Sequence, residues 1–195
     1  MLLSSHYFHG TPLMSLQTGT RLGTINEPII DPRQLQVLAY YVDGPLLDER
    51  PSIILIEDIR EIGEIGFIID SSDDITAPGD IIRLQEVIEL GFELPGLKVI
   101  DEKNHHLGRV LDYNIDSTSF EIRQIRVKPP VIRMLGLSEL MIHRDQIVKI
   151  TNDRMIVKST ATQKKIEADR KTPRAYTNPF RGTTPQPETS TIDKP

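Results

Sequence analysis

The chain has 195 residues, no cysteine and a net charge of −5 at pH 7. The lack of cysteine excludes disulfide bonds, thiolate metal ligands and cysteine nucleophiles. The charge is unevenly distributed, because the segment from Lys158 onward holds eight basic and four acidic residues and leaves −9 on the rest of the chain. An acidic body of this kind disfavours nucleic-acid binding outside the basic C-terminal segment.

Residues 1–12 show no apolar periodicity, and we expect a flexible lead-in. The first residues contain neither a basic start nor a long apolar run, which argues against a signal peptide or a membrane segment. The sequence therefore predicts a cytoplasmic protein without a transmembrane segment.

Residues 13–71 are predicted to form a first small domain of antiparallel strands. Apolar and polar residues alternate along several short runs, which turn-forming residues separate. Gly19 adopts positive φ easily and marks the first hairpin turn, and the carboxylate of Asp31 can accept backbone amides in the second. The expected strands are 13–16, 22–30, 35–42, 52–56, 59–62 and 67–70.

Residues 72–92 are predicted to contain a loop and one connecting helix. Asp80 is a good N-cap, and Gly91 is a typical residue at a helix end. A helix of about ten residues is unstable alone, so we expect its apolar stripe to be buried against the neighbouring β-structure. The stripe consists of Ile81, Leu84, Val87 and Ile88.

Residues 93–159 repeat the pattern of residues 13–71. The pair Leu22-Gly23 recurs as Leu107-Gly108, 85 positions later, and a three-residue insertion after the third strand raises the offset to 88. We interpret both glycines, Gly23 and Gly108, as strand bends where a side chain would collide with the facing sheet. The residues of the second copy that correspond to Gly19 and Asp31 are Asn104 and Asp116.

Five or six short strands per copy, with no helix inside either copy, predict that each sheet closes into a small barrel. A domain of about 60 residues is marginal alone, so we expect the copies to share an interface. From residue 160 onward, prolines and threonines replace aliphatic residues, which predicts disorder. The expected fold is all-β, with two tandem small antiparallel β-barrels joined by a short α-helix and a disordered basic tail over 160–195.

Two stretches of the second copy resemble the PRC-barrel family, a small β-barrel named for the photosynthetic reaction centre. They are residues 97–113, which contain the pattern Leu-Gly-x-Val, and residues 140–150. The first copy departs from the family pattern at Pro28, which would interrupt a central strand. The resemblance implies a protein-interaction module without shared catalytic residues. Family members include the C-terminal domain of a ribosome-maturation factor, which binds a small-subunit ribosomal protein, and the cytoplasmic part of the reaction-centre H subunit.

No catalytic, cofactor-binding or metal-binding residues are predicted. The glycines form no phosphate-binding loop pattern. His105 and His106 are adjacent on a predicted strand and would point to opposite faces, so one metal ion cannot bind both. His6 and His9 have a usable spacing but no carboxylate near them in the sequence. The acidic run 70–74 lacks the glycine and the distal glutamate of an EF-hand, and we interpret it as a solvated loop.

Two segments are candidate interaction surfaces. The insertion after Val127 carries large apolar side chains around one arginine, which suits either a partner surface or a plug over the second barrel. Its candidate residues are Val131, Ile132, Arg133, Met134, Leu135 and Leu137. The tail interleaves basic and aromatic residues that can attract RNA or another anionic surface. Its candidate residues are Arg170, Lys171, Arg174, Tyr176, Phe180 and Arg181.

The leading hypothesis is a non-enzymatic adaptor of the PRC-barrel type that binds another protein through a sheet face or through the insertion. The alternative is an RNA- or ribosome-associated factor, active in RNA processing or ribosome maturation, that uses the basic tail. Neither hypothesis requires a cofactor.

Overall fold

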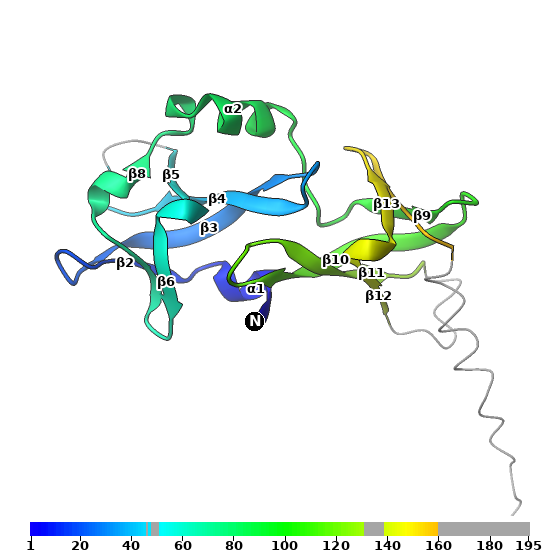
Figure 1. Ribbon diagram of the computed structural model, residues 1–195, viewed down its shortest axis with the longest axis horizontal. Helices are drawn as coiled ribbons and strands as arrows, with labels where there is room; N and C mark the ends of the chain where they lie inside the picture. The colour runs from blue at the N-terminus through cyan, green and yellow to red at the C-terminus, as the bar shows by residue number, and fades with distance from the viewer. Residues whose placement is uncertain (46, 48–50, 131–138, 160–195) are drawn as a thin grey trace, which may run out of the picture. The chain divides into compact units, whose positions relative to one another are not determined.

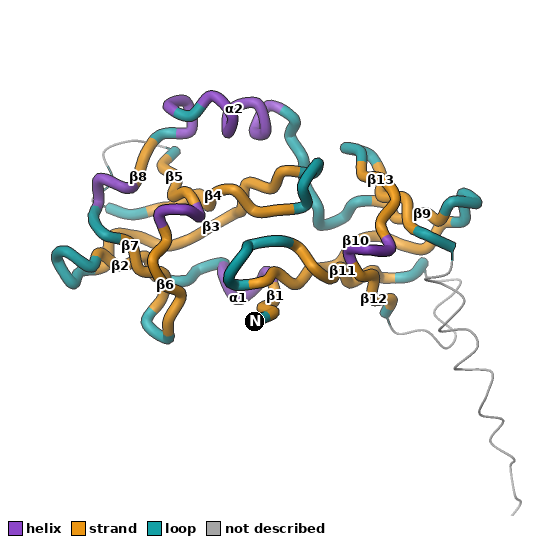
Figure 2. Tube along the Cα trace, in the orientation of Figure 1, coloured by secondary structure: helices purple, strands orange, loops and turns teal. Residues whose placement is uncertain are grey.

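The computed structural model describes residues 1–45, 47, 51–130 and 139–159. Strands dominate, and the helical segments between them are short (Figures 1 and 2). The first sheet contains β2 (Pro12–Ser15), β3 (Arg21–Asp31), β4 (Gln36–Asp43), β5 (Ser52–Leu55), β6 (Ile59–Gly63), β7 (Gly66–Ile69) and β8 (Ile75–Thr76). The second contains β1 (Leu2–Ser4), β9 (Lys98–Asp101), β10 (His106–Asp116), β11 (Ile122–Lys128), β12 (Leu140–His143), β13 (Ile147–Ile150) and β14 (Arg154–Val157). The helices are α1 (Ser5–Phe8) and α2 (Ile82–Glu89), with 3-10 turns η1 (Ile56–Asp58), η2 (Ser72–Asp74), η3 (Pro78–Asp80) and η5 (Arg144–Gln146). No helix within the described ranges is long and apolar enough to cross a membrane.

The two sheets have the same topology. The strand order is β6-β7-β2-β3-β4-β5 in the first sheet and β13-β14-β9-β10-β11-β12 in the second. In both sheets the first strand of the repeat pairs in parallel with the last. The first sheet adds β8 beside β5, and the second adds β1 beside β10. The repeat in the sequence is therefore a repeat of strand order and pairing.

The prediction that each sheet closes into a barrel is wrong. Within the described ranges, no hydrogen-bonded ladder joins the edge strands β6 and β8 of the first sheet or β12 and β13 of the second. The exposed edge of β6 is protected in another way, because it carries the charged residues Arg60 and Glu61 and a register shift beside them. Charges and bulges both discourage pairing with a further strand. Each repeat is an open sheet.

The two repeat glycines lie where neighbouring strands approach closely. A Cβ atom at Gly108, whose φ is +150°, would lie 2.1 Å from the carbonyl oxygen of Lys128. A Cβ atom at Gly23 would lie 2.6 Å from the carbonyl oxygen of Asp43. The collision is therefore with the adjacent strand of the same sheet, and the expected collision with a facing sheet is wrong.

Pro28 does not interrupt its strand. It lies inside β3, and the ladder to β4 shifts register between Ile25 and Pro28. A bulge at this point removes the need for the amide hydrogen that proline lacks.

The turns use the residue types that their geometry requires. Gly19 and Asn104 have φ of 66° and 62°, in the left-handed region that these two residue types tolerate best. The carboxylates of Asp31 and Asp116 accept hydrogen bonds from backbone amides two residues ahead, at 2.8 and 3.0 Å. Equivalent turns therefore fix the hairpins of both repeats.

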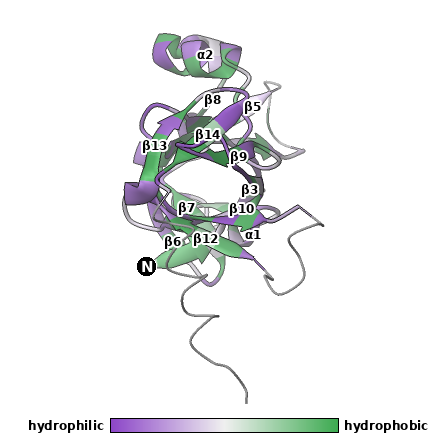
Figure 3. Cartoon of the chain, turned by 90° about the vertical axis from the view of Figure 1, so that its right-hand side faces the viewer, coloured by the Kyte–Doolittle hydropathy of each residue, from purple (hydrophilic) through white to green (hydrophobic). Residues whose placement is uncertain are grey.

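The helix α2 covers the outer face of the first sheet with its apolar stripe (Figure 1). Its residues are both hydrophobic and hydrophilic (Figure 3), as expected of a helix with one buried face. Leu84 and Val87 are buried, and they form a second core cluster with Ile29, Ala39 and Ile53. The equivalent positions of the second sheet, which α2 does not cover, are Asn114, Gln124 and Met141.

The predicted N-cap of this helix is wrong by one residue. Ile81 holds the N-cap position, because Pro78 starts a 3-10 turn that includes Asp80. The carboxylate of Asp80 instead accepts a hydrogen bond from the hydroxyl of Thr76 at 2.9 Å. Gly91, with φ of 57°, follows the end of the helix.

The expectation of a flexible lead-in is also wrong. Leu2–Ser4 form β1 and pair with β10, and Ser5–Phe8 form α1. The ring of Phe8 is 1% exposed and contacts the rings of Tyr40, Phe67 and Phe120. The segment shows no periodicity because it changes from strand to helix within seven residues.

The two repeats meet at the tips of their central hairpins, within one compact unit. Leu35 and Phe120 occupy equivalent positions and both have positive φ, 49° and 54°. The amide of Val37 donates to the carbonyl oxygen of Phe120 at 3.0 Å, and the amide of Ile122 donates to that of Leu35 at 2.9 Å. Since Val37 and Ile122 are also equivalent, a local two-fold axis relates the repeats at this contact.

Candidate functional site

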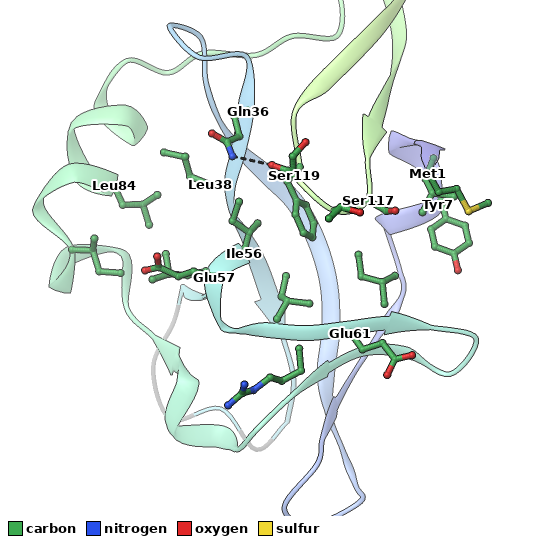
Figure 4. Close-up of a pocket in the computed structure, with 18 of the residues that line it drawn as sticks. Met1, Tyr7, Gln36, Leu38, Ile56, Glu57, Glu61, Leu84, Ser117 and Ser119 are labelled. Carbon is green, nitrogen blue, oxygen red and sulfur yellow. Dashed lines mark hydrogen bonds between the residues drawn. The ribbon is translucent and has the colours of Figure 1, made fainter.

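A cleft of about 910 Å³ opens beside the contact between the repeats (Figure 4). Its walls come from the N-terminal segment, β4, β5 with η1, β6, the start of α2 and the turn between β10 and β11. We call it the inter-repeat cleft. The aliphatic side chains that line it are Leu3, Leu38, Leu55, Ile56, Ile59, Ile62, Ile81 and Leu84.

Four exposed charged side chains surround these aliphatic residues. The guanidinium of Arg60 is already paired, because its Nε donates to a carboxylate oxygen of Asp70 at 2.8 Å. This hydrogen bond lowers the pKa of the Asp70 carboxyl. Among the described residues, Glu57, Glu61 and Arg83 form no ion pair. Outside ion pairs, the charged side chains that line the cleft are therefore two carboxylates and one guanidinium.

A third carboxyl group lies beside this acidic end of the cleft. Burial raises the pKa of Asp58 in η1, and the nearby charges of Asp74 and Glu57 raise it further. The carboxyl groups of Glu57, Asp58 and Asp74 therefore lie near one another around η1.

On the opposite side of the two-fold axis, the equivalent place is closed by Arg144. One terminal nitrogen of its guanidinium donates to the carbonyl oxygen of Leu35 at 2.9 Å, and the other donates to that of Gln34. Arg144 is the first residue of η5, as Ile56 is the first residue of η1. The two side chains are therefore equivalents that differ in chemistry.

The cleft exists because the first repeat lacks this arginine. The side chain of Ile56 has no donor, and the side-chain amide Nε2 of Gln36 instead donates to the carbonyl oxygen of Ser119 at 2.9 Å (Figure 4). A second pair of equivalent residues also differs in being aliphatic or charged. Leu38 lines the cleft, whereas its equivalent Arg123 forms an ion pair with Glu121 on the other side. One side of the repeat interface is sealed by polar side chains, and the other side is open and apolar.

A buried carboxylate fixes the N-terminal wall of the cleft. Asp112 on β10 is 1% exposed, and it accepts hydrogen bonds from the hydroxyls of Ser4, at 2.8 Å, and Ser5 and from the guanidinium of Arg126. Burial favours the neutral acid, but these hydrogen bonds outweigh it and lower the pKa of Asp112. The network anchors α1, which places Tyr7 in the cleft wall.

The histidines lie partly where the sequence indicated. His105 lies in the turn before β10, not on the strand, and its Nδ1 is 2.9 Å from the buried carboxylate of Asp101. His6 is exposed, and the fold brings its Nε2 to 4.0 Å from a carboxylate oxygen of Asp112, although no carboxylate lies near it in the sequence. In the part of the chain that the structure describes, no group of three or more potential ligands could hold a metal ion.

Both predicted interaction segments lie outside the described residues. The insertion residues 131–137 and the tail residues 160–195 therefore stay predictions. The cleft itself was not predicted, because its walls come from five separated stretches of sequence. The sequence did contain one signal, a difference between the aligned copies. Leu38 and Ile56 of the first copy are aliphatic, whereas the residues aligned with them, Arg123 and Arg144, are basic.

Comparison of the sequence with models of known protein families and with curated proteins finds no significant match. Membership of the PRC-barrel family therefore stays a prediction from the two motifs of the second copy.

Proposed function

We propose that the protein is a non-enzymatic interaction module that binds an extended segment of a partner protein in the inter-repeat cleft. The single observation that carries this proposal is the broken symmetry of the repeat interface. A contact that is sealed by Arg144 on one side is left open and apolar on the other.

The chemistry of the cleft suits side chains of a protein. Aliphatic residues with charged groups around them match the apolar centre and polar rim of protein interfaces. The volume of about 910 Å³ accommodates a few side chains. Anchoring by side chains is favoured over addition of a strand, because the edge of β6 carries charges and a register shift.

The repeat supplies a matched pair of variants for the test. Ile62 on β6 lines the cleft, and its equivalent Ile150 on β13 does not. Both side chains are half-buried and pack against the main core. Ile62→Asp and Ile150→Asp therefore perturb the fold to a similar degree, but only the first places a charge in the cleft.

Peptides selected from a displayed library against the full chain are titrated with both variants. We expect Ile62→Asp to weaken binding at least about tenfold, since burying one such side chain contributes about 1.5–3 kcal/mol. Ile150→Asp should bind as the natural chain does. Equal affinities for the two variants, or selection of no cleft-dependent peptide, would overturn the proposal.

A further inference from the structure

We propose that the inter-repeat cleft binds an arginine side chain of the partner segment, whose guanidinium donates to the carbonyl oxygen of Phe120 as Arg144 donates to that of Leu35. This inference rests on the proposed function and names the chemistry of its anchor residue.

The internal template is the sealed side of the two-fold axis. There the carbonyl oxygen of Leu35 accepts two hydrogen bonds, from the amide of Ile122 and from Arg144. The planar guanidinium also reaches the neighbouring carbonyl oxygen of Gln34. A guanidinium is suited to this place because its fork of donors can reach two acceptors at once.

The open side presents the same backbone without the donor. The carbonyl oxygen of Phe120 accepts the amide of Val37, and Ile56 supplies no second hydrogen bond. No other side chain in the described part of the chain donates to this oxygen. A carbonyl oxygen has two lone pairs, so Phe120 retains an acceptor that is occupied in its equivalent, Leu35.

The surroundings complement a cation with an aliphatic stem. Glu57 and Glu61 line the cleft, and Arg83 is the cationic lining residue outside the Arg60–Asp70 pair. The methylene groups of an arginine can pack along Ile56 while its head group is hydrogen-bonded. Lysine has the charge but not the fork, and an aliphatic residue has neither.

The test uses the full isotope-labelled chain and Nα-acetyl-arginine amide as the probe, with the acetyl amides of lysine and norleucine as comparisons. A ligand of this size is expected to bind with a Kd on the order of 1 mM. The amide of Val37 reports on the open side, and the amide of Ile122 reports on the sealed side. We expect saturable shifts at Val37, at least about tenfold weaker binding of the other two probes, and no shift at Ile122.

Two substitutions exchange the two sides. Ile56→Arg supplies the guanidinium from within the chain and should abolish the response at Val37. Arg144→Ile removes it from the sealed side and should create a response at Ile122. If both variants respond as the natural chain does, the inference is overturned.

A third variant guards against loss of folding in Ile56→Arg. Gln36→Glu copies Glu121, its equivalent at the bridge between the repeats, and frees the carbonyl oxygen of Ser119 while adding a negative charge. We expect it to bind the arginine probe about threefold to tenfold more tightly, and unchanged or weaker binding would contradict the inference.

Selected peptides that need the cleft but show no preference for arginine would overturn this inference and leave the proposed function standing.

Discussion

Removal of the Asp112 carboxylate should release the N-terminal wall of the cleft. Asp112→Ala deletes the acceptor of two hydroxyl hydrogen bonds and one ion pair with Arg126. Breaking a buried charge pair costs about 3–5 kcal/mol, and each hydrogen bond to a charged group contributes about 1.5–3 kcal/mol. Because the side chain of Arg126 is 33% exposed, water recovers part of the loss, and we expect about 3 kcal/mol.

Two measurements on the full chain check this expectation. Urea denaturation gives the loss in free energy of unfolding, and hydrogen exchange shows whether residues 2–8 lose protection. Ser4→Ala is the control, because it removes one hydroxyl but keeps the ion pair, and it should cost about 1.5 kcal/mol, the lower end of that range, since Ser4 is half-buried. The reasoning is refuted if Asp112→Ala costs no more than Ser4→Ala or leaves the exchange of residues 2–8 unchanged.

The same carboxylate predicts a dependence on pH. The folded-state pKa of Asp112 is lower than its unfolded value of about 3.9, so its contribution is complete above that value and is lost as pH falls through the folded pKa. Between about pH 6 and about pH 3 the natural chain should therefore lose more stability than Asp112→Ala. Equal losses would show that another group causes the acid sensitivity.

Three further predictions concern the fold and the tail. Gly108→Ala should lower the free energy of unfolding by about 3 kcal/mol or more, since a φ of +150° is strained for alanine and the added Cβ meets backbone atoms. Gly79→Ala is the control in the same urea denaturation and should be nearly neutral, because no atom lies within 4 Å of its added Cβ. Tyr40→Phe should leave the melting temperature unchanged or raise it, because the buried Tyr40 hydroxyl has no hydrogen-bond partner among the described residues. Deletion of residues 160–195 should abolish any co-sedimentation with ribosomes at low salt, and unchanged co-sedimentation would remove the RNA-binding alternative.

The duplication explains how two small sheets form one stable unit. Sheets of this size bury little apolar surface alone. The rings of Phe8, Tyr40, Phe67 and Phe120 come from both repeats and the N-terminal segment, and they pack into one core. We expect a duplicated module of this kind to keep its two-fold contact where it stabilises the core and to diverge at the surface beside it.

Alternation of apolar residues determined the strands, because a pleated strand presents side chains to opposite faces in a local pattern. The sequence likewise indicated the helix between the repeats, whose buried stripe includes Leu84 and Val87. The turns at Gly19 and Asn104 could also be predicted, because positive φ is a preference of the residue type itself. Each of these features depends on contacts or conformations within a few residues.

Tertiary structure alone decided the features that join distant segments. Whether a sheet closes depends on the pairing of its two edges, and edge pairing leaves no local pattern in the sequence. The N-terminal segment forms a strand and a helix because it contacts Asp112 and a core built from both repeats. The cleft follows from Ile56 meeting a turn more than 60 residues away, whereas its equivalent Arg144 meets the other turn and fills the space. Long-range packing of this kind is a property of the folded chain, so two copies with the same strand order differ at their contact, where one side holds Arg144 and the other side holds an apolar cleft.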